Sequence, residues 1–194
     1  MKKWLMSVLL MAMALMAGCA SKVPTTEYYL LSAGNGPFKA AQTDKPGYFI
    51  APVVLADHLN RTALVMLRGQ QQVQLAHYHV WAEPLASGVT QVLEYELNQI
   101  CACEVTSARQ GITNNEQRQE IRLIIDQMAV NEAGQVTLSG SYVLAGLSMQ
   151  RFYLQQTLTE NGFEAAVLTQ RRLLAQLASH ITQHSGNGVA GGSQ

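Results

Sequence analysis

The sequence contains few charged residues and has no excess of either sign. Among its 194 residues there are 13 lysines and arginines and 13 aspartates and glutamates, which together make up 13% of the chain. No segment gathers basic residues into the stripe that is typical of nucleic-acid-binding domains. The composition therefore predicts no nucleic-acid partner.

Motifs of known catalytic and cofactor sites are also lacking. The sequence has no phosphate-binding loop, no dinucleotide-binding glycine pattern and no paired-carboxylate motif. The nearest approach to a serine-hydrolase elbow is the string LSGSYV, which lacks the flanking glycines and places Ser139 and Ser141 in a predicted strand. We expect no catalytic residues, no enzyme activity and no bound cofactor.

Two pairs of histidines have spacings that occur in metal sites. His77 and His79 would share one face of a strand, and His180 and His184 would lie one turn apart near the end of a helix. Neither pair has an evident third ligand, and positive charge near a helix C-terminus is favourable in any case. We interpret these histidines as solvent-facing or capping residues and predict no metal site.

Long hydrophobic runs are absent except at the N-terminus. Lys2 and Lys3 precede an apolar segment, residues 4–17, that only Ser7 interrupts, and small residues follow at 18–21. A basic start, a short apolar core and small residues are the three parts of a secretory signal peptide. A transmembrane helix needs roughly 20 apolar residues, more than this segment has, and no later segment repeats such a run. Residues 1–18 are therefore predicted to be a signal peptide.

The end of this segment, Met16-Ala17-Gly18-Cys19, resembles the lipobox of bacterial lipoproteins, with Met16 in place of the usual leucine. The resemblance implies cleavage between Gly18 and Cys19, a diacylglyceryl group on the Cys19 sulfur and an acyl chain on its amine. Two or more acyl chains hold a protein stably at a membrane, at about 0.8 kcal/mol per buried CH₂. In such signals, the absence of aspartate after the cysteine implies the outer membrane.

The only other cysteines are Cys101 and Cys103, in the string ICACEV. If this segment is a strand, both side chains share a face and their Cα atoms lie about 6.5–7 Å apart, at the limit for a disulfide. Three interpretations stay open: two small buried residues, an oxidised or strained pair, and a metal or redox role.

Strand patterns recur along the rest of the chain. Residues 27–31 form one candidate, and residues 48–59 another, in which Pro52 indicates an edge or a bulge. Two short apolar runs flank residues 69–71 and predict a hairpin. Three further runs are predicted to form an antiparallel meander, and they lie at residues 120–130, 135–146 and 149–158.

Two segments have helical periodicity. In the first, Pro84 stands in the first turn, where proline is tolerated, and an apolar stripe follows at Leu85, Val89, Val92, Leu93, Leu97 and Ile100. In the second, the stripe comprises Phe163, Val167, Leu174, Leu177, Ala178 and Ile181. The pattern predicts an α+β fold, a mostly antiparallel sheet with two main helices packed on it. We expect a spacer at 19–26, a single domain at 27–184 and a disordered tail at 185–194.

Four segments in this order resemble the ABC-type transport auxiliary lipoprotein family, the PqiC-like lipoproteins. They are EYYLL, APVVLADHLNR, HVWAEPL and GQVTLSGSYVL, and the resemblance covers residues 19–184. The most distinctive residues are Trp81, Pro84 and Leu85, for which the resemblance implies a structural or interface role. Trp81 is either a core anchor or an aromatic contact for a partner.

The resemblance implies an outer-membrane lipoprotein, anchored in the membrane by lipid and facing the periplasm. It would serve as a non-enzymatic accessory to MCE-domain proteins, which form tunnels for lipid transport between the two membranes, and it would form a homo-oligomeric ring. Two other hypotheses are a lipoprotein that assists assembly of outer-membrane proteins or secretins, and an envelope hydrolase with cryptic catalytic residues.

Overall fold

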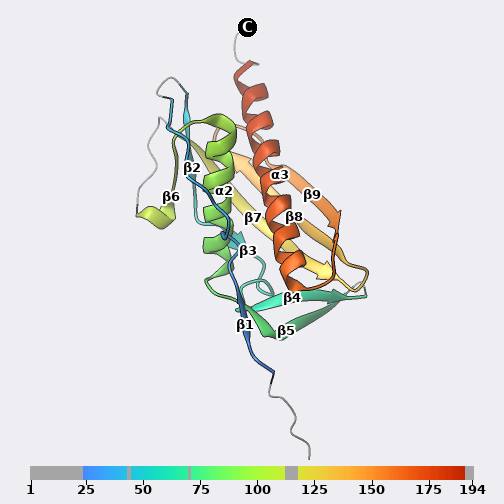
Figure 1. The fold of residues 1–194 in the computed structure, drawn as a ribbon. Coiled ribbons are helices and arrows are strands. Elements are labelled where there is room, and N and C mark those ends of the chain that lie inside the picture. The colour runs from blue at the N-terminus through green and yellow to red at the C-terminus, as the bar shows by residue number, and fades with distance from the viewer. Residues whose placement is uncertain (1–23, 43–44, 70, 112–117, 191–194) are drawn as a thin grey trace, which may run out of the picture.

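Two long helices pack against one face of a curled sheet (Figure 1). The computed structural model describes residues 24–42, 45–69, 71–111 and 118–190, and within them the sheet has nine strands. The predicted α+β fold is confirmed. The sheet is mixed rather than strictly antiparallel, because its three long pairings are antiparallel and its five short pairings are parallel.

The centre of the sheet is β7 (Arg118–Asn131). It pairs antiparallel with β8 (Gln135–Leu144), which in turn pairs antiparallel with β9 (Gln150–Thr157). The predicted meander is therefore confirmed. In β7 and β9 buried residues alternate with more exposed ones, so that one face lies under the helices, whereas β8, between them, has no exposed residue.

Three short strands share the other edge of β7, and all run parallel to it. They are β2 (Gly47–Ile50), β3 (Val54–Leu55) and β4 (Ala63–Arg68). Pro52 lies in the link between β2 and β3, as its missing N–H would require. A further strand, β6 (Val105–Ser107), pairs parallel with β2.

The predicted hairpin around residues 69–71 is also confirmed. It joins β4 to β5 (Gln72–Trp81) in antiparallel register. The first strand, β1 (Glu27–Tyr29), pairs parallel with the last three residues of β5. The N-terminal strand is thus held at the edge of the sheet beside the start of the first helix.

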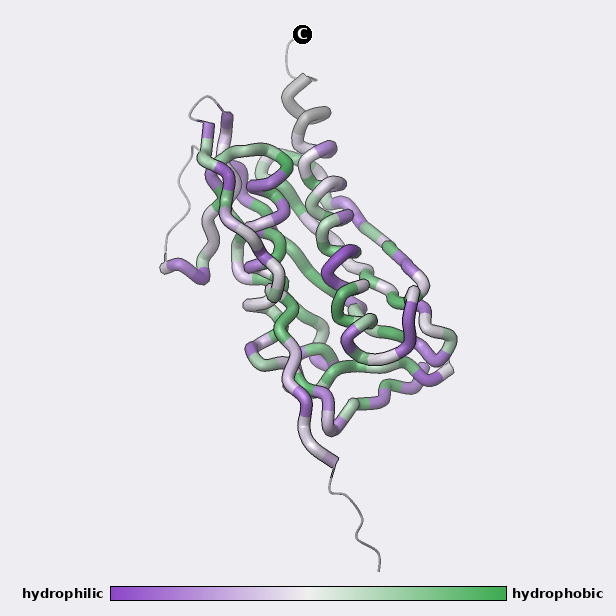
Figure 2. The backbone as a smooth tube through the Cα atoms, viewed as in Figure 1, coloured by the Kyte–Doolittle hydropathy of each residue, from purple (hydrophilic) through white to green (hydrophobic). Residues whose placement is uncertain are grey.

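The helices are α2 (Leu85–Cys101) and α3 (Phe163–Ala190). In α2 the predicted apolar stripe is buried except for Ile100, whose side chain is 45% exposed. Hydrophobic residues lie along the strands behind the helices and in stripes along the helices themselves (Figure 2). Arg171 of α3 forms an ion pair with Glu96 of α2 at 3.2 Å and donates a hydrogen bond to Asn35 at 2.7 Å, which ties the two helices together.

The C-terminal boundary differs from the prediction. Helix α3 does not end at residue 184 but continues through Ala190, into the segment predicted to be a disordered tail. The hydroxyl of Ser185 donates a hydrogen bond to Gln119 of β7, so the helix still contacts the sheet at this point. Once a helix is established, each further residue adds a hydrogen bond without a new nucleation cost. Residues 191–194 lie outside the described residues, as do the predicted signal peptide and Cys19.

A glycine on β8 allows two strands to approach closely. A Cβ atom on Gly140 would lie 2.1 Å from the backbone carbonyl oxygen of Ile124. At this place the register of β7 and β8 shifts between Ile125 and Gln127, which turns the β7 backbone toward Gly140. No side chain fits without a movement of the backbone.

We expect Gly140→Ala to lower the free energy of unfolding by about 1–3 kcal/mol, because the added methyl group forces the two central strands apart. The matched control is Ser139→Ala, one residue away on the opposite face of the strand, where the side chain is partly exposed, with an expected change within about 0.5 kcal/mol. Equilibrium urea unfolding followed by circular dichroism measures both. Equal midpoints for Gly140→Ala and the unchanged protein would contradict the close approach.

Candidate functional site

The distinctive motif of the sequence forms the junction between β5 and α2. Trp81 ends β5 with 7% of its surface exposed, and its N–H donates a hydrogen bond to the carbonyl of Thr62 at 2.7 Å. The N–H of the next residue, Ala82, donates to Tyr29 of β1 at 2.9 Å. Pro84 caps the helix and is exposed, whereas Leu85 is buried. Trp81 and Leu85 are thus core residues that join β1, β5 and α2.

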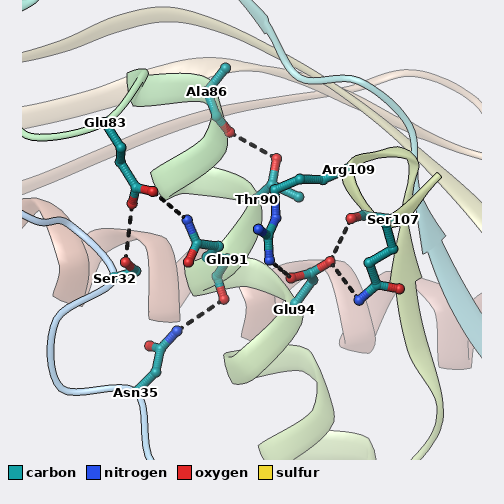
Figure 3. A network of polar contacts seen from close by, with 10 residues as sticks. Ser32, Asn35, Glu83, Ala86, Thr90, Gln91, Glu94, Ser107 and Arg109 are labelled. Atoms are coloured by element: carbon teal, nitrogen blue, oxygen red, sulfur yellow. Dashed lines mark hydrogen bonds and ion pairs between the residues drawn. The ribbon is translucent and has the colours of Figure 1, made fainter.

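Glu83 holds the segment after β1 against this junction. Its carboxylate accepts hydrogen bonds from the hydroxyl of Ser32 at 3.1 Å and from the amide of Gln91 at 2.7 Å (Figure 3). Asn35 donates a further hydrogen bond to the carbonyl of Gln91 at 3.2 Å. The carboxylate also lies near the start of α2, where negative charge is favourable.

A second, polar stripe runs along α2. Thr90, Glu94 and Asn98 follow at intervals of four residues, and each is buried. The Glu94 carboxylate accepts hydrogen bonds from Ser107 and from Gln110, the latter at 3.3 Å, and forms an ion pair with Arg109 at 3.5 Å (Figure 3). These partners lie in β6 and in the short helix η1 (Ala108–Gln110). The stripe therefore binds the segment after β6 to α2.

Asn98 likewise binds neighbouring segments of the chain to the end of α2. Its side-chain oxygen accepts a hydrogen bond from the N–H of Lys39 at 2.6 Å, and its amide donates to the carbonyls of Lys39 and Cys103 at 3.1 and 3.0 Å. One side chain thus holds both the loop before β2 and the chain that leaves the helix.

Cys101 and Cys103 form a disulfide in the structure. Of the three interpretations left open, the oxidised pair is the one that the structure contains. The segment is not a strand: Cys101 is the last residue of α2, and Ala102 has a left-handed conformation with φ of 49°. This turn brings the two Cα atoms to 5.1 Å, closer than a strand would.

An open hollow of about 290 Å³ lies beside the polar stripe. The link between β2 and β3 forms one wall, the first turns of α2 form another, and Arg109 lies at its margin. The nearest buried carboxylate, Glu94, already has three partners. The hollow is therefore lined mainly by apolar side chains, and Glu94, which is not part of the lining, is engaged in holding the fold.

Comparison with known proteins identifies the family of this chain. The sequence profile of the ABC-type transport auxiliary lipoprotein component matches residues 29–182. The chain belongs to this family. A matched span of this length includes every strand and both helices described above, apart from Glu27 and Tyr28 of β1 and the part of α3 after residue 182.

Two solved structures have a similar fold. One, of a protein described only as uncharacterized, is 19% identical with a TM-score of 0.70, and the match covers 82% of this chain and 98% of the other. The second, protein XCC0632 from Xanthomonas campestris, is 11% identical with a TM-score of 0.58, over 88% of this chain and 99% of the other. At these identities the likeness shows the fold. No curated protein matches the sequence.

The histidines of this family member do not form pairs around a common site. His79 stacks on Phe163 with ring centroids 3.7 Å apart, while His77 is exposed. His184 contacts the ring of Tyr142, and His180 is exposed. Because α3 continues to Ala190, the second pair does not lie in the last turns as predicted. Among the described residues, no three histidine, cysteine or acidic side chains gather closely enough to hold a metal ion.

A small polar cluster surrounds His79 at the N-terminal edge. The hydroxyl of Tyr29 donates to Glu27 at 2.6 Å and lies 3.0 Å from Nδ1 of His79. Burial, with a contribution from the hydrogen bond to Glu27, raises the pKa of Tyr29 to about 12. The phenol therefore remains a proton donor to Glu27 at all physiological pH values.

Ser139 and Ser141 lie on β8, and within the described residues neither hydroxyl is hydrogen-bonded to a histidine.

No helix among the described residues is both long and apolar enough to cross a membrane. The transport-auxiliary role of the family is in keeping with a protein that acts by binding.

Sequence reasoning missed the polar stripe of α2. The signal was present, because Thr90, Glu94 and Asn98 recur at i, i+4 and i+8 beside the apolar stripe. Polar residues at this spacing usually indicate a solvated face. Only the position of β6 and η1 shows that they are covered.

We expect Glu94→Ala to lower the free energy of unfolding by about 2–3 kcal/mol, because it leaves the fully buried Ser107 and the adjacent Gln110 without their acceptor. Glu132→Ala is the matched control: it removes an exposed ion pair with Arg68, for which a loss below about 1 kcal/mol is expected. Thermal and urea unfolding measure both variants. If the two substitutions had equal effects, the stripe would not bind the segment after β6.

Proposed function

We propose that this chain is a non-enzymatic accessory lipoprotein of an MCE-type intermembrane lipid transport system. In this proposal acylated Cys19 anchors the domain at the periplasmic face of the outer membrane, and the domain docks the end of the periplasmic tunnel protein. The observation that carries the proposal is the family match over residues 29–182 in a chain whose residues 16–19 resemble a lipobox.

The arrangement of the chain supports a docking role. Both helices begin near β1 and the β4–β5 hairpin, where the described chain starts, and run toward the opposite end of the molecule (Figure 1). We call this opposite end the far end: it comprises the last turn of α2, the first residues of β7, the β8–β9 connection and the last turns of α3. A tether at the N-terminus leaves the far end free to meet a partner.

The far end has exposed apolar side chains that suit such a contact. Ile100 in the last turn of α2 is 45% exposed, and Met149 in the β8–β9 connection is 56% exposed. Phe38, 54% exposed, borders the far end: it lies beside Tyr95, in the loop that Asn98 holds to the end of α2. Partly exposed apolar groups of this kind form the cores of protein interfaces. The proposal assigns them to the tunnel protein.

The proposal also includes a ring of identical copies. β9 offers an edge for such an assembly, because within the described residues it pairs with β8 on one side only. An unpaired edge can accept a strand from a neighbouring chain.

Crosslinking in cells tests the proposal. A photo-crosslinking amino acid at Ile100 should yield a product with an MCE-domain protein, because this position lies at the far end. The matched control is Leu168, an apolar residue of α3 with a similar exposure of 47%, which lies near the start of that helix. We expect little product from it. Cys19→Ser should remove the product at Ile100, because the unanchored chain no longer reaches the outer membrane.

The identity of the product separates the alternatives. A crosslink to an outer-membrane β-barrel or a secretin would favour the assembly-factor hypothesis. If the anchored protein gave no MCE-domain product from Ile100, Phe38 or Met149, the docking role would be wrong.

A further inference from the structure

The length of the N-terminal spacer limits where the membrane can lie. Cys19 precedes Pro24, the first described residue, by five positions, and β1 begins at Glu27. A fully extended chain spans at most about 3.6 Å per residue, so Pro24 lies within about 18 Å of Cys19 and the start of β1 within about 29 Å. If Cys19 carries the acyl chains, as the proposed function requires, β1 lies close to the bilayer surface.

The surface near β1 carries large exposed side chains. Tyr28 of β1 is 70% exposed, and Leu30 just after it is 48% exposed. On β5, Tyr78 is 47% exposed. The two strands are direct neighbours, with Tyr28 opposite Val80, two residues along from Tyr78. We call Tyr28, Leu30 and Tyr78 the anchor-end surface.

The two strands that carry these side chains contain little charge. Residues 24–31 and 72–81 contain one acidic residue, Glu27, and no lysine, arginine or aspartate. The Glu27 carboxylate is engaged by the Tyr29 hydroxyl and lies 3.2 Å from Nδ1 of His79. No basic cluster is present that would require anionic lipids. Tyrosine, with an apolar ring and a polar hydroxyl, is the residue type enriched at the membrane–water interface.

We propose that the anchor-end surface rests on the phospholipid bilayer, with Tyr28 and Tyr78 at the level of the lipid headgroups. The occupant of this surface is the bilayer to which the chain is tethered. The contact is made by uncharged aromatic and aliphatic side chains, so it does not depend on anionic headgroups.

This contact would orient the whole domain. A tether alone leaves the domain free to tumble, whereas a tether together with a surface contact fixes which end faces the lipid. Helix α3 begins at Phe163, whose ring stacks on His79 of the same end, and is 28 residues long. At 1.5 Å per residue it extends about 42 Å, so the far end is held away from the bilayer.

Spin labels on the full-length lipidated protein in phosphatidylcholine vesicles test this contact. Tyr28→Cys and Tyr78→Cys provide labelling sites, because Cys101 and Cys103 are joined in a disulfide and acylated Cys19 has no free thiol. Tyr153→Cys is the matched control: Tyr153 is 64% exposed and lies on β9, at the opposite margin of the sheet from β1. The protein without an added cysteine should remain unlabelled, and circular dichroism verifies that each variant is folded.

Power saturation compares the access of oxygen, which concentrates in lipid, with that of a water-soluble nickel chelate. We expect the ratio of oxygen to nickel accessibility to be several-fold higher at positions 28 and 78 than at position 153. Replacement of a third of the phosphatidylcholine by phosphatidylglycerol should leave this difference unchanged. Equal ratios at all three positions, or a difference present only with the anionic lipid, would overturn the proposal.

Vesicle flotation separates this failure from that of the proposed function. Protein that floats with the vesicles but shows equal ratios is anchored without the surface contact, and only this inference fails. Protein that does not float has no anchor, and the anchoring part of the proposed function fails with it. A far-end crosslink to an MCE-domain protein would still stand in the first case.

Discussion

The whole fold depends on β7 having partners on both edges. β8 occupies one edge along most of its length, and three short strands share the other. The inward residues Ile121, Leu123 and Ile125 are almost fully buried, and both helices pack on the face that they form. Because β2, β3 and β4 are too short to persist alone, their positions, and the helices that cover them, depend on this strand.

Local patterns were enough to predict part of this arrangement. Strand patterns at residues 120–130, 135–146 and 149–158 predicted the β7–β8–β9 meander, and apolar residues at helical spacing predicted both helices. The parallel pairings could not be predicted in the same way, because each joins short segments that are far apart in the sequence, such as Val54 and Ile124. The Cys101–Cys103 disulfide depends on the left-handed Ala102, and the end of α3 depends partly on a contact with Gln119, neither of which leaves a pattern in the chain.

The candidate site residues also divide into those that could be predicted from the sequence and those that only the fold reveals. Trp81 and Leu85 stood out in the sequence, and the structure places them in the core at the junction of β1, β5 and α2. Glu94 did not stand out, because only the fold brings Ser107 and Arg109 to it. Gly18 and Cys19 lie outside the described residues, so their roles rest on the resemblance of residues 16–19 to a lipobox.

In the proposed arrangement the domain has an anchor end, which holds the N-terminus, and a far end, which is free to meet a partner. Family membership supplies the transport-auxiliary role, and the proposed anchor supplies the location and orientation. Mass spectrometry of the mature N-terminus tests this anchor most directly. The account predicts a chain that begins at Cys19 and carries a diacylglyceryl group and an amide-linked acyl chain. A mature chain with an unmodified cysteine, or one cleaved elsewhere, would contradict it.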